Sequence, residues 1–388
     1  MTITHPIARA WLSTGGTGSQ NYDELADEAE ITRIIAANPA SALAIEMPHR
    51  APENTGRGFA ESLPDAVARL EAAKAAGRYV PHDDVAALYR ITAPDGTTSH
   101  GLWCMVDTDQ ISASADEPGL VIRNEDVFID KVRERVALAQ ALGHLLSPVL
   151  LLQTADGLEA ALASAVPGPP AVADRDQAGR THEVWPLPAG PARDRLLALA
   201  GGGQLVVADG NHRSLAAQLA GLPRFLAVVT TPGAVTIQPY HRLVSELPGE
   251  FAARLPGEVR LLPGRPAVPE TRGVIHLYTN GNGFAVRLPT DPDATGVDNL
   301  DHALVERHLL GDALGLDPGD KRITYVGGDY PASWLCDEVD AGRAELAILI
   351  APVTVADFVA VNLARLKMPR KSTWFTPKAR AGLVVAQL

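Results

Sequence analysis

"LVVADGNHRSLAAQLAG", residues 205–221, joins an apolar run to a segment with helical spacing. Leu205–Ala208 is continuously apolar, which is typical of a strand buried on both faces. Beyond it, one face of a helix is apolar and consists of Leu215, Ala216, Leu219 and Ala220. Gly221 then ends the helix, with Pro223 behind it. The stretch predicts a buried strand that turns directly into a helix.

The turn between strand and helix carries five unlike residues, Asp209, Gly210, Asn211, His212 and Arg213. It falls at a helix N-terminus, where backbone N–H groups and the helix dipole favour an anion. Glycine permits close approach of the backbone, and Arg213 adds a forked donor that matches phosphate oxygens. Asp209 would repel a bare phosphate, so it predicts a divalent metal that bridges acid and phosphate. We interpret the turn as a phosphate and metal cradle with Asp209 as the metal ligand.

A structural alternative stays open for the same turn. Asp209 would then be an N-cap, His212 a packed imidazole and Arg213 a member of a surface ion pair. The sequence lacks the better-known phosphate motifs, because it has no GxxxxGK(S/T) and "GGTGSQ" at 15–20 lacks a third glycine and a preceding strand.

A second strand-to-helix junction lies in "GLVIRNEDVFIDKVRERVALAQALGHLLSPVLLL", residues 119–152. It predicts a strand, a polar turn, an amphipathic helix and another strand. Glu125 and Asp126 sit in the turn, as Asp209 does in the first unit. Two such junctions in one sheet can bring their ends together, so Glu125 is a candidate general base or metal ligand. Alternatively, both acids only complement the helix dipole.

The rest of the chain mixes helical and strand-like patterns. Residues 20–47 predict a helix and then a strand after Pro39, and 64–77 predict a helix. A hairpin is expected over 86–107, a loop or linker over 164–182 and strands over 233–300, with helices at 301–316 and 355–367. This mixture predicts an α/β or α+β architecture.

Composition limits the classes of partner. The formal net charge is −12 over 388 residues, which disfavours nucleic acid and anionic membrane surfaces. The two cysteines, Cys104 and Cys336, form no CxxC pair, so we expect neither a zinc site nor a disulfide framework, and a cytoplasmic setting. The start of the sequence predicts no signal peptide, and no run is long enough for a membrane span.

At both junctions the sequence resembles a known family. "NEDVFIDKVRERVALAQALGHLLSPVLLL" and "VVADGNHRSLAAQLAG" resemble the ParB-like nucleotide-binding domain and the free serine kinases. They are most similar to an uncharacterised DUF family built around Asp-Gly-His-His-Arg, as are "NYDEL", "PYHRLV" and "MPRKSTWFTPKARAGLVV". The resemblance implies a nucleotide-binding core over 101–245, with α/β segments at 1–100 and 246–388.

The resemblance also implies roles for single residues. Glu125 takes the place of the catalytic glutamate that deprotonates the serine hydroxyl, although Asn124 replaces the usual preceding histidine. Asp209 matches the acid that handles metal and substrate, while Gly210, His212 and Arg213 match phosphate-binding residues. Asn211 replaces the first histidine of the signature, and an amide can donate to phosphate but cannot shuttle a proton.

Further candidates come from two other segments. Lys371, Ser372, Thr373 and Lys378 in "KSTWFTPK" could line an anionic pocket or belong to a C-terminal strand. His241 and Arg242 either reach the cradle or pair with acids around Glu246. His302 and His308 fit one helical face poorly and are expected at the surface.

Two functions from different classes remain. The first is a small-molecule kinase that transfers a phosphoryl group from ATP or ADP, with Mg²⁺, to the hydroxyl of free L-serine or a similar amino acid, giving O-phosphoserine. The second is a non-catalytic ParB-like nucleotide-binding regulator or scaffold. Duplex DNA binding is disfavoured because the charge is negative and clustered Arg and Lys are missing. A homodimer is compatible with the sequence.

Overall fold

Apolar strands and short helices alternate along the chain and build two compact units, residues 1–235 with 377–388, and residues 236–376. The computed structural model describes residues 2–17, 21–25, 28–112, 119–123, 125, 127–248, 251–294 and 296–388. Asn124 and Asp126, which the sequence places beside Glu125, lie outside the described residues.

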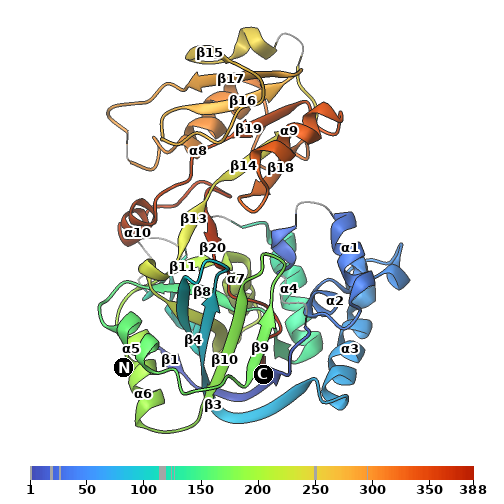
Figure 1. Ribbon diagram of the computed structural model, residues 1–388, viewed down its shortest axis with the longest axis vertical. Helices are drawn as coiled ribbons and strands as arrows, with labels where there is room; N and C mark the ends of the chain where they lie inside the picture. Colours follow the sequence, from blue (N-terminus) through green and yellow to red (C-terminus); the bar gives the residue numbers. More distant parts are fainter. Residues whose placement is uncertain are drawn as a thin grey trace. The chain divides into compact units, whose positions relative to one another are not determined.

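The first unit is built on one large sheet, in the order β5-β6-β11-β8-β12-β4-β3-β2-β21-β7, with β1 paired to β4 and β10 paired to β3 and β9 (Figure 1). Its strands are β1 (Thr4–His5), β2 (Ile7–Ser13), β3 (Tyr79–Thr92), β4 (Thr98–Asp107), β5 (Ile111–Ser112), β6 (Val121–Ile122), β7 (His144–Leu145), β8 (Val149–Gln153), β9 (Val172–Arg175), β10 (Thr181–Leu187), β11 (Leu205–Asp209), β12 (Arg224–Thr230) and β21 (Val384–Gln387).

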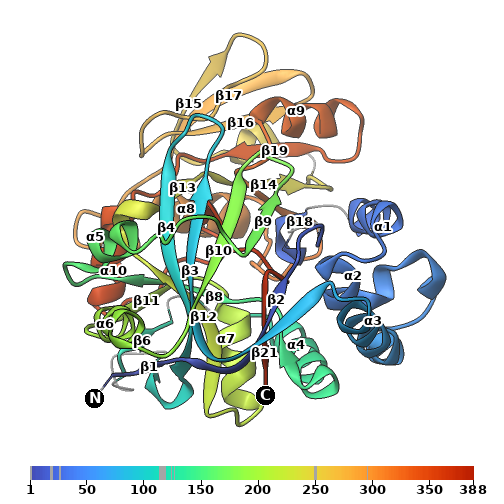
Figure 2. The ribbon, with the colours of Figure 1, turned by 60° about the horizontal axis from the view of Figure 1, so that its bottom comes forward.

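Helices cover this sheet. They are α1 (Glu28–Ala37), α2 (Ala42–Glu46), α3 (Leu63–Ala75), α4 (Ile129–Leu142), α5 (Leu158–Ser164), α6 (Pro191–Ala200) and α7 (Asn211–Leu219), with 3-10 turns η1 (Tyr22–Glu24), η2 (Pro48–Arg50), η3 (Pro52–Asn54), η4 (Ala60–Ser62), η5 (Thr108–Gln110) and η6 (Pro232–Ala234). Helices α1, α2 and α3 gather at one side of the unit (Figure 2). The largest apolar core lies where β4, β8, β11 and β12 meet α5 and α6.

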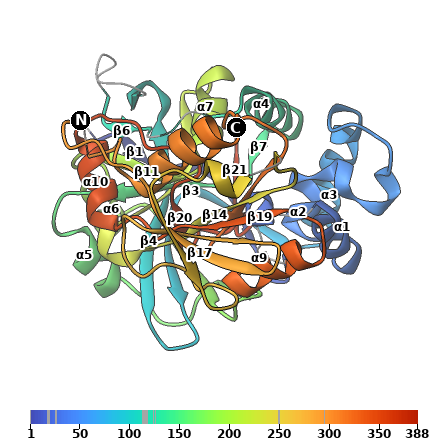
Figure 3. The same ribbon diagram turned by 90° about the horizontal axis from the view of Figure 1, so that it is seen from above.

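Two strand-to-helix units stand side by side in this sheet. β6 and β11 are parallel neighbours, with Leu205 opposite Val121 and Val206 opposite Ile122. The helices that follow them, α4 and α7, pack against each other and lie side by side in every view (Figure 3). Parallel strands end at the same edge of a sheet, so both junctions lie at one edge.

The second unit is an antiparallel sheet in the order β15-β17-β16-β19-β14-β18, with a separate β13–β20 pair. Its elements are β13 (Thr236–Gln238), β14 (Tyr240–Val244), η7 (Phe251–Arg254), β15 (Glu258–Leu262), β16 (Ile275–Thr279), β17 (Asn282–Arg287), α8 (Asp301–Leu304), the π-helix η8 (Val305–Ala313), β18 (Ile323–Gly327), α9 (Ala332–Asp340), β19 (Leu346–Leu349), α10 (Val355–Leu363) and β20 (Trp374–Thr376).

Successive side chains along its strands point to opposite faces, and both faces of this second sheet are apolar. Val244 and Leu277 pack on the side of α8 and η8, while their neighbours Leu243 and Tyr278 pack on the side of α9. A period of two side chains along a strand produces this division.

The structure confirms the predicted mixed α/β class, the helix over 64–77 and the hairpin over 86–107. The strand predicted after Pro39 is wrong, because Ser41 Oγ accepts from Ala44 N and starts helix α2 there. The loop predicted over 164–182 is partly wrong, because β9 pairs with β10 inside it.

On the apolar face that the sequence predicts for α7, Ala216 is buried and Leu219 is exposed. One burial prediction is wrong. His302, expected at the surface, is completely buried, and its Nε2 lies 3.1 Å from the Tyr240 carbonyl oxygen.

The predicted boundaries after residues 100 and 245 remain an interpretation. The β3–β4 hairpin runs across the first of them, and β14 ends next to the second. Among the described residues, no helix combines the length and apolar character that crossing a bilayer requires.

Candidate active site

Helix α7 begins directly after Gly210, as the sequence predicts. Gly210 is the N-cap with a φ of 101°, and the first intrahelical bond runs from Ser214 N to Gly210 O at 2.9 Å. The N–H groups of residues 211–213 precede that bond, which is the position from which helix N-termini bind anions. The predicted strand Leu205–Ala208 is the buried part of β11.

Glycine is required at this turn for two reasons. A φ of 101° is disfavoured for residues with a side chain. In addition, a Cβ at Gly210 would lie 3.1 Å from Arg213 Nε and 3.2 Å from Val149 Cα. The turn is therefore pressed against β8 and against the Arg213 side chain.

Arg213 connects the turn by hydrogen bonds to the segment before β8 and to Asp209. Its Nη1 donates to the Pro148 carbonyl oxygen at 2.5 Å, and its Nη2 donates to Asp209 Oδ2 at 2.5 Å. The guanidinium is buried, so this is a buried ion pair and not the surface pair of the structural alternative. In this arrangement Arg213 orients Asp209 and the loop before β8.

Lys378 completes the charge cluster at the turn. Its Nζ lies 3.6 Å from Asp209 Oδ1, and its side chain is buried. One carboxylate therefore stands between two cations. The sequence pattern grouped Lys378 with Lys371, Ser372 and Thr373, whereas the structure places Lys378 in the first unit and the other three in the second.

His212 connects the two helices that leave the sheet edge. Its Nε2 accepts a hydrogen bond from Phe128 N at 3.1 Å, and its ring stacks on the Phe128 ring. Because Nε2 is the acceptor, the proton of the neutral imidazole resides on Nδ1. His212 is packed against the start of α4, as the structural alternative expected.

Glu125 lies in the segment between β6 and α4, half-buried and outside the helix. The separation of 84 residues that relates His212 to Phe128 also relates Leu205 to Val121. Asp209 is the last residue of β11, whereas Glu125 lies beyond the end of β6 at Ile122 and before the start of α4 at Ile129. The acid in the first turn of α4 is Asp130.

Few of the described side chains could hold a metal together at this turn. The described residues contain no cluster of three or more His, Cys, Asp or Glu side chains that fits a metal ion. Both oxygens of Asp209 face cations. Asp209 with its present neighbours is thus a poor fit for a resident metal.

The remaining candidates lie in the second unit, where His241, Arg242 and Ser372 are buried and Lys371 and Thr373 are partly exposed. Arg242 is completely buried, and its guanidinium donates to the carbonyl oxygens of Tyr240, His241, Arg370 and Lys371. It lies over the Tyr325 ring and 3.8 Å from Glu306, not beside Glu246. His241 Nδ1 accepts from Ile350 N. Arg242 thus brings His241 together with the segment that contains Lys371, Ser372 and Thr373.

A family model described as protein of unknown function (DUF1015) matches residues 17–303 of the chain. No curated protein sequence matches this chain.

Solved structures with a distant likeness include a free serine kinase in complex with AMP, which is 13% identical with a TM-score of 0.40 over 71% of this chain and 87% of that chain. A conserved hypothetical protein from Pyrococcus furiosus is 12% identical with a TM-score of 0.38, over 72% and 95%. SbnI with a C-terminal truncation, from Staphylococcus aureus, is 12% identical with a TM-score of 0.41, over 72% and 84%.

Proposed function

The chain belongs to this family of proteins of unknown function, and we propose that it is a small-molecule kinase. It transfers the terminal phosphoryl group of ATP or ADP to the hydroxyl of free L-serine or a similar amino acid. One observation supports the proposal: β6 and β11 are parallel neighbours, so the N-terminus of α7 and the Glu125 segment both follow strands that end at one sheet edge.

The nucleotide phosphates bind at the N-terminus of α7. Phosphoryl transfer depends mainly on positioning and on neutralising charge, and the first-turn N–H groups supply donors for both. Gly210 allows the positive φ with which the turn enters α7, while Asn211 and His212 bring side-chain donors to the same turn. Lys378 and Arg213 place two cations beside the turn, and cations favour an anion there.

Arg213 acts in this proposal as a positioning residue. Its guanidinium is engaged with Asp209 and with the Pro148 carbonyl oxygen, so it fixes the shape of the turn. Mg²⁺ enters as part of the substrate, the metal complex of the nucleotide, because Mg²⁺ in such sites is held largely by phosphates and water. Asp209 is the carboxylate of the turn that such a complex would meet.

Glu125 is the general base. It accepts the proton of the acceptor hydroxyl as the hydroxyl oxygen bonds to the terminal phosphorus. The bond between that phosphorus and its bridging oxygen breaks, and the nucleotide leaves with one phosphate fewer. Proteins place a base within hydrogen-bond reach of the proton it removes, and a segment at the same sheet edge as the phosphate turn meets that need.

Glu125→Gln tests the base. The amide keeps shape and hydrogen bonding but removes basicity, so turnover should fall about 10²–10⁴-fold while nucleotide affinity stays unchanged. Phosphorus NMR with ATP or ADP, Mg²⁺ and L-serine measures transfer, and calorimetry measures nucleotide binding. Asp130→Asn is the matched control, because it removes the acid of the first helical turn and should leave turnover unchanged.

Full turnover in Glu125→Gln would assign the base elsewhere, with Asp209 as the next candidate. Tight nucleotide binding by the wild-type chain without transfer to any amino acid or related alcohol would favour a nucleotide-binding regulator over a kinase.

A further inference from the structure

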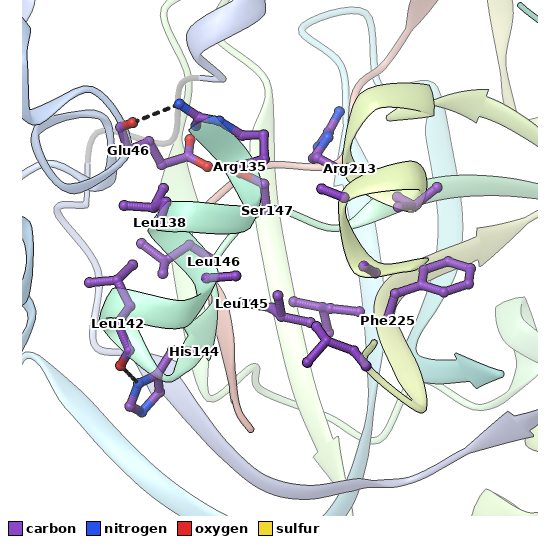
Figure 4. A pocket seen from close by; sticks show the side chains of 16 residues that line it. Glu46, Arg135, Leu138, Leu142, His144, Leu145, Leu146, Ser147, Arg213 and Phe225 are labelled. Carbon is purple, nitrogen blue, oxygen red and sulfur yellow. Dashed lines mark hydrogen bonds between the residues drawn. The ribbon is translucent and has the colours of Figure 1, made fainter. Parts of the chain in front are cut away.

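Two cations stand beside Asp209 at the phosphate turn, and they reach it from different parts of the chain. Arg213 belongs to the first turn of α7, where it lines a small pocket between α4 and α7 (Figure 4). Lys378 comes from residues 377–383, which return to the first unit and join β20 to β21. This segment contains neither helix nor strand, yet residues 378–383 are buried. Buried backbone without regular pairing needs other partners for its polar groups.

The side chain of Asn21 supplies two of these partners. Its Nδ2 donates to the Ala379 carbonyl oxygen at 3.0 Å, and its Oδ1 accepts from Ala381 N at 2.9 Å. One primary amide thus pairs with the backbone on both sides of Arg380, as a neighbouring strand would. Asn21 is 1% exposed, so both bonds are shielded from water. The first of them fixes the chain one residue after Lys378.

The Arg380 side chain holds the same point of the segment. It is buried, and two carboxylates share its guanidinium: Nη1 pairs with Glu24 Oε2, and Nη2 donates to Asp176 Oδ2 at 2.8 Å. Asp176 is held in turn by His182 Nε2 at 3.2 Å and by Arg180 Nη1 at 3.4 Å. Separating the members of a buried ion pair leaves an uncompensated charge, so displacement of Arg380 from its two carboxylates is costly.

The segments that meet here are "NYDEL", residues 21–25, and "PKARAGLVV", residues 377–385. Both belong to the stretches on which the family resemblance rests, and neither pattern by itself gives Asn21 a partner. The sheet brings them together, because β2 and β21 are antiparallel neighbours and Ser13 N donates to the Leu383 carbonyl oxygen at 3.0 Å.

We propose that Asn21 is a positioning residue for Lys378. By fixing the backbone at Ala379 and Ala381, it holds the Lys378 ammonium 3.6 Å from Asp209 Oδ1, where the ammonium favours the phosphates of a nucleotide. A lysine on an unfixed segment would lose more conformational entropy on binding, and preorganisation removes this cost. The inference rests on the proposed phosphate site at the N-terminus of α7.

A double-mutant cycle tests whether Asn21 acts through Lys378, with calorimetric titration of the full chain with ATP and Mg²⁺ as the measurement. Asn21→Ala should weaken ATP binding about threefold to tenfold, the scale of a hydrogen bond between neutral groups. In a chain that already carries Lys378→Met, the same change should alter ATP affinity by less than about twofold, because the lysine it positions is gone.

Tyr79→Phe is the matched control. It removes the hydroxyl that donates to the Gly382 carbonyl oxygen at 3.0 Å, in the same segment but beyond Arg380. Urea denaturation should show a loss of stability for both variants, whereas ATP affinity should fall only for Asn21→Ala. Amide exchange at Ala381 should accelerate in Asn21→Ala, because this N–H group loses its acceptor. Asn21→Ser retains a small polar group and takes the place of Asn21→Ala in the cycle if the alanine variant does not fold.

Failure of the phosphate site and failure of the positioning role give different results. If the wild-type chain does not bind ATP, or Lys378→Met binds ATP as tightly as the wild-type chain, the phosphates are not at this turn and both proposals are wrong. If Lys378→Met weakens ATP binding but Asn21→Ala does not, or weakens it equally in both backgrounds, the phosphate site stands and the positioning role of Asn21 is overturned.

Discussion

At the turn before α7, we expect replacement of Gly210 to be strongly destabilising. Gly210→Ala forces a side chain into a φ of 101° and within 3.2 Å of both Arg213 Nε and Val149 Cα. We expect a loss of about 1–3 kcal/mol in unfolding free energy, measured by urea denaturation, together with weakened nucleotide binding. Gly221→Ala is the control, since φ is +67° but no atom lies within 4 Å of its Cβ, so its loss should be smaller and nucleotide binding unaffected. Equal effects of the two changes would contradict a steric role for the turn.

For single residues, the sequence predicts features that depend on near neighbours in the chain and misses contacts between segments far apart in the chain. The apolar strand, the glycine and the helix N-terminus fall within the seven residues 205–211 and follow from turn chemistry and periodicity. The contacts of Arg213 with Pro148 and of Asp209 with Lys378 join segments 65 and more residues apart. No periodic pattern encodes such pairs, so they require the folded sheet.

Helices and strands also differ in how well the sequence predicts them. Long periodic segments, such as α3 and the β3–β4 hairpin, are predictable because burial repeats along them. Short ones are not: α2 has five residues and depends on the Ser41 cap, and β9 has four and depends on its pairing with β10. The π-helix η8 also escapes prediction, because helical spacing assumes 3.6 residues per turn and π-helices are rare.

One hydrogen bond that a substitution can remove joins His212 of α7 to Phe128, the residue before α4. His212→Phe keeps an aromatic ring against Phe128 but deletes the Nε2 acceptor of the Phe128 N–H group. The expected loss is about 1–2 kcal/mol of unfolding free energy, because a backbone donor loses its partner. Amide hydrogen exchange at Phe128 should accelerate at the same time. His212→Gln, which offers an oxygen acceptor, should recover part of the loss, and unchanged exchange in His212→Phe would argue against the coupling.

On the scale of a whole unit, acid should destabilise residues 236–376. Burial first, and then the Arg242 charge, lowers the pKa of His241 to about 3 and holds the pKa of His302 well below its ordinary value. Both rings stay neutral in the folded unit while the unfolded chain takes up protons below about pH 6.5. Stability is therefore complete above that pH and falls below it, by about 1.4 kcal/mol per pH unit for each histidine.

Urea unfolding at pH 7.5, 6.5 and 5.5, followed by hydrogen exchange in β14, measures this dependence. His241→Asn keeps an acceptor for the Ile350 N–H group and removes the titrating ring, so the slope below pH 6.5 should become shallower. A slope equal to that of the wild-type chain would contradict the assignment to His241.

Nucleotide binding should appear as a stability change in the first unit, which connects the residues of the turn to the behaviour of the molecule. A ligand that binds only the folded state at 100 times its Kd adds about 2.7 kcal/mol to the unfolding free energy. ATP with Mg²⁺ should therefore raise the first unit's unfolding transition and slow amide exchange at residues 211–215, where the α7 N–H groups meet phosphate. Lys378→Met removes one cation of the cluster and should reduce both effects. Lys321→Met removes a cation of the second unit and should change neither. If ATP stabilises Lys378→Met as strongly as the wild-type chain, or protects a different helix N-terminus, the phosphates bind elsewhere and the Gly210 turn is only a structural junction.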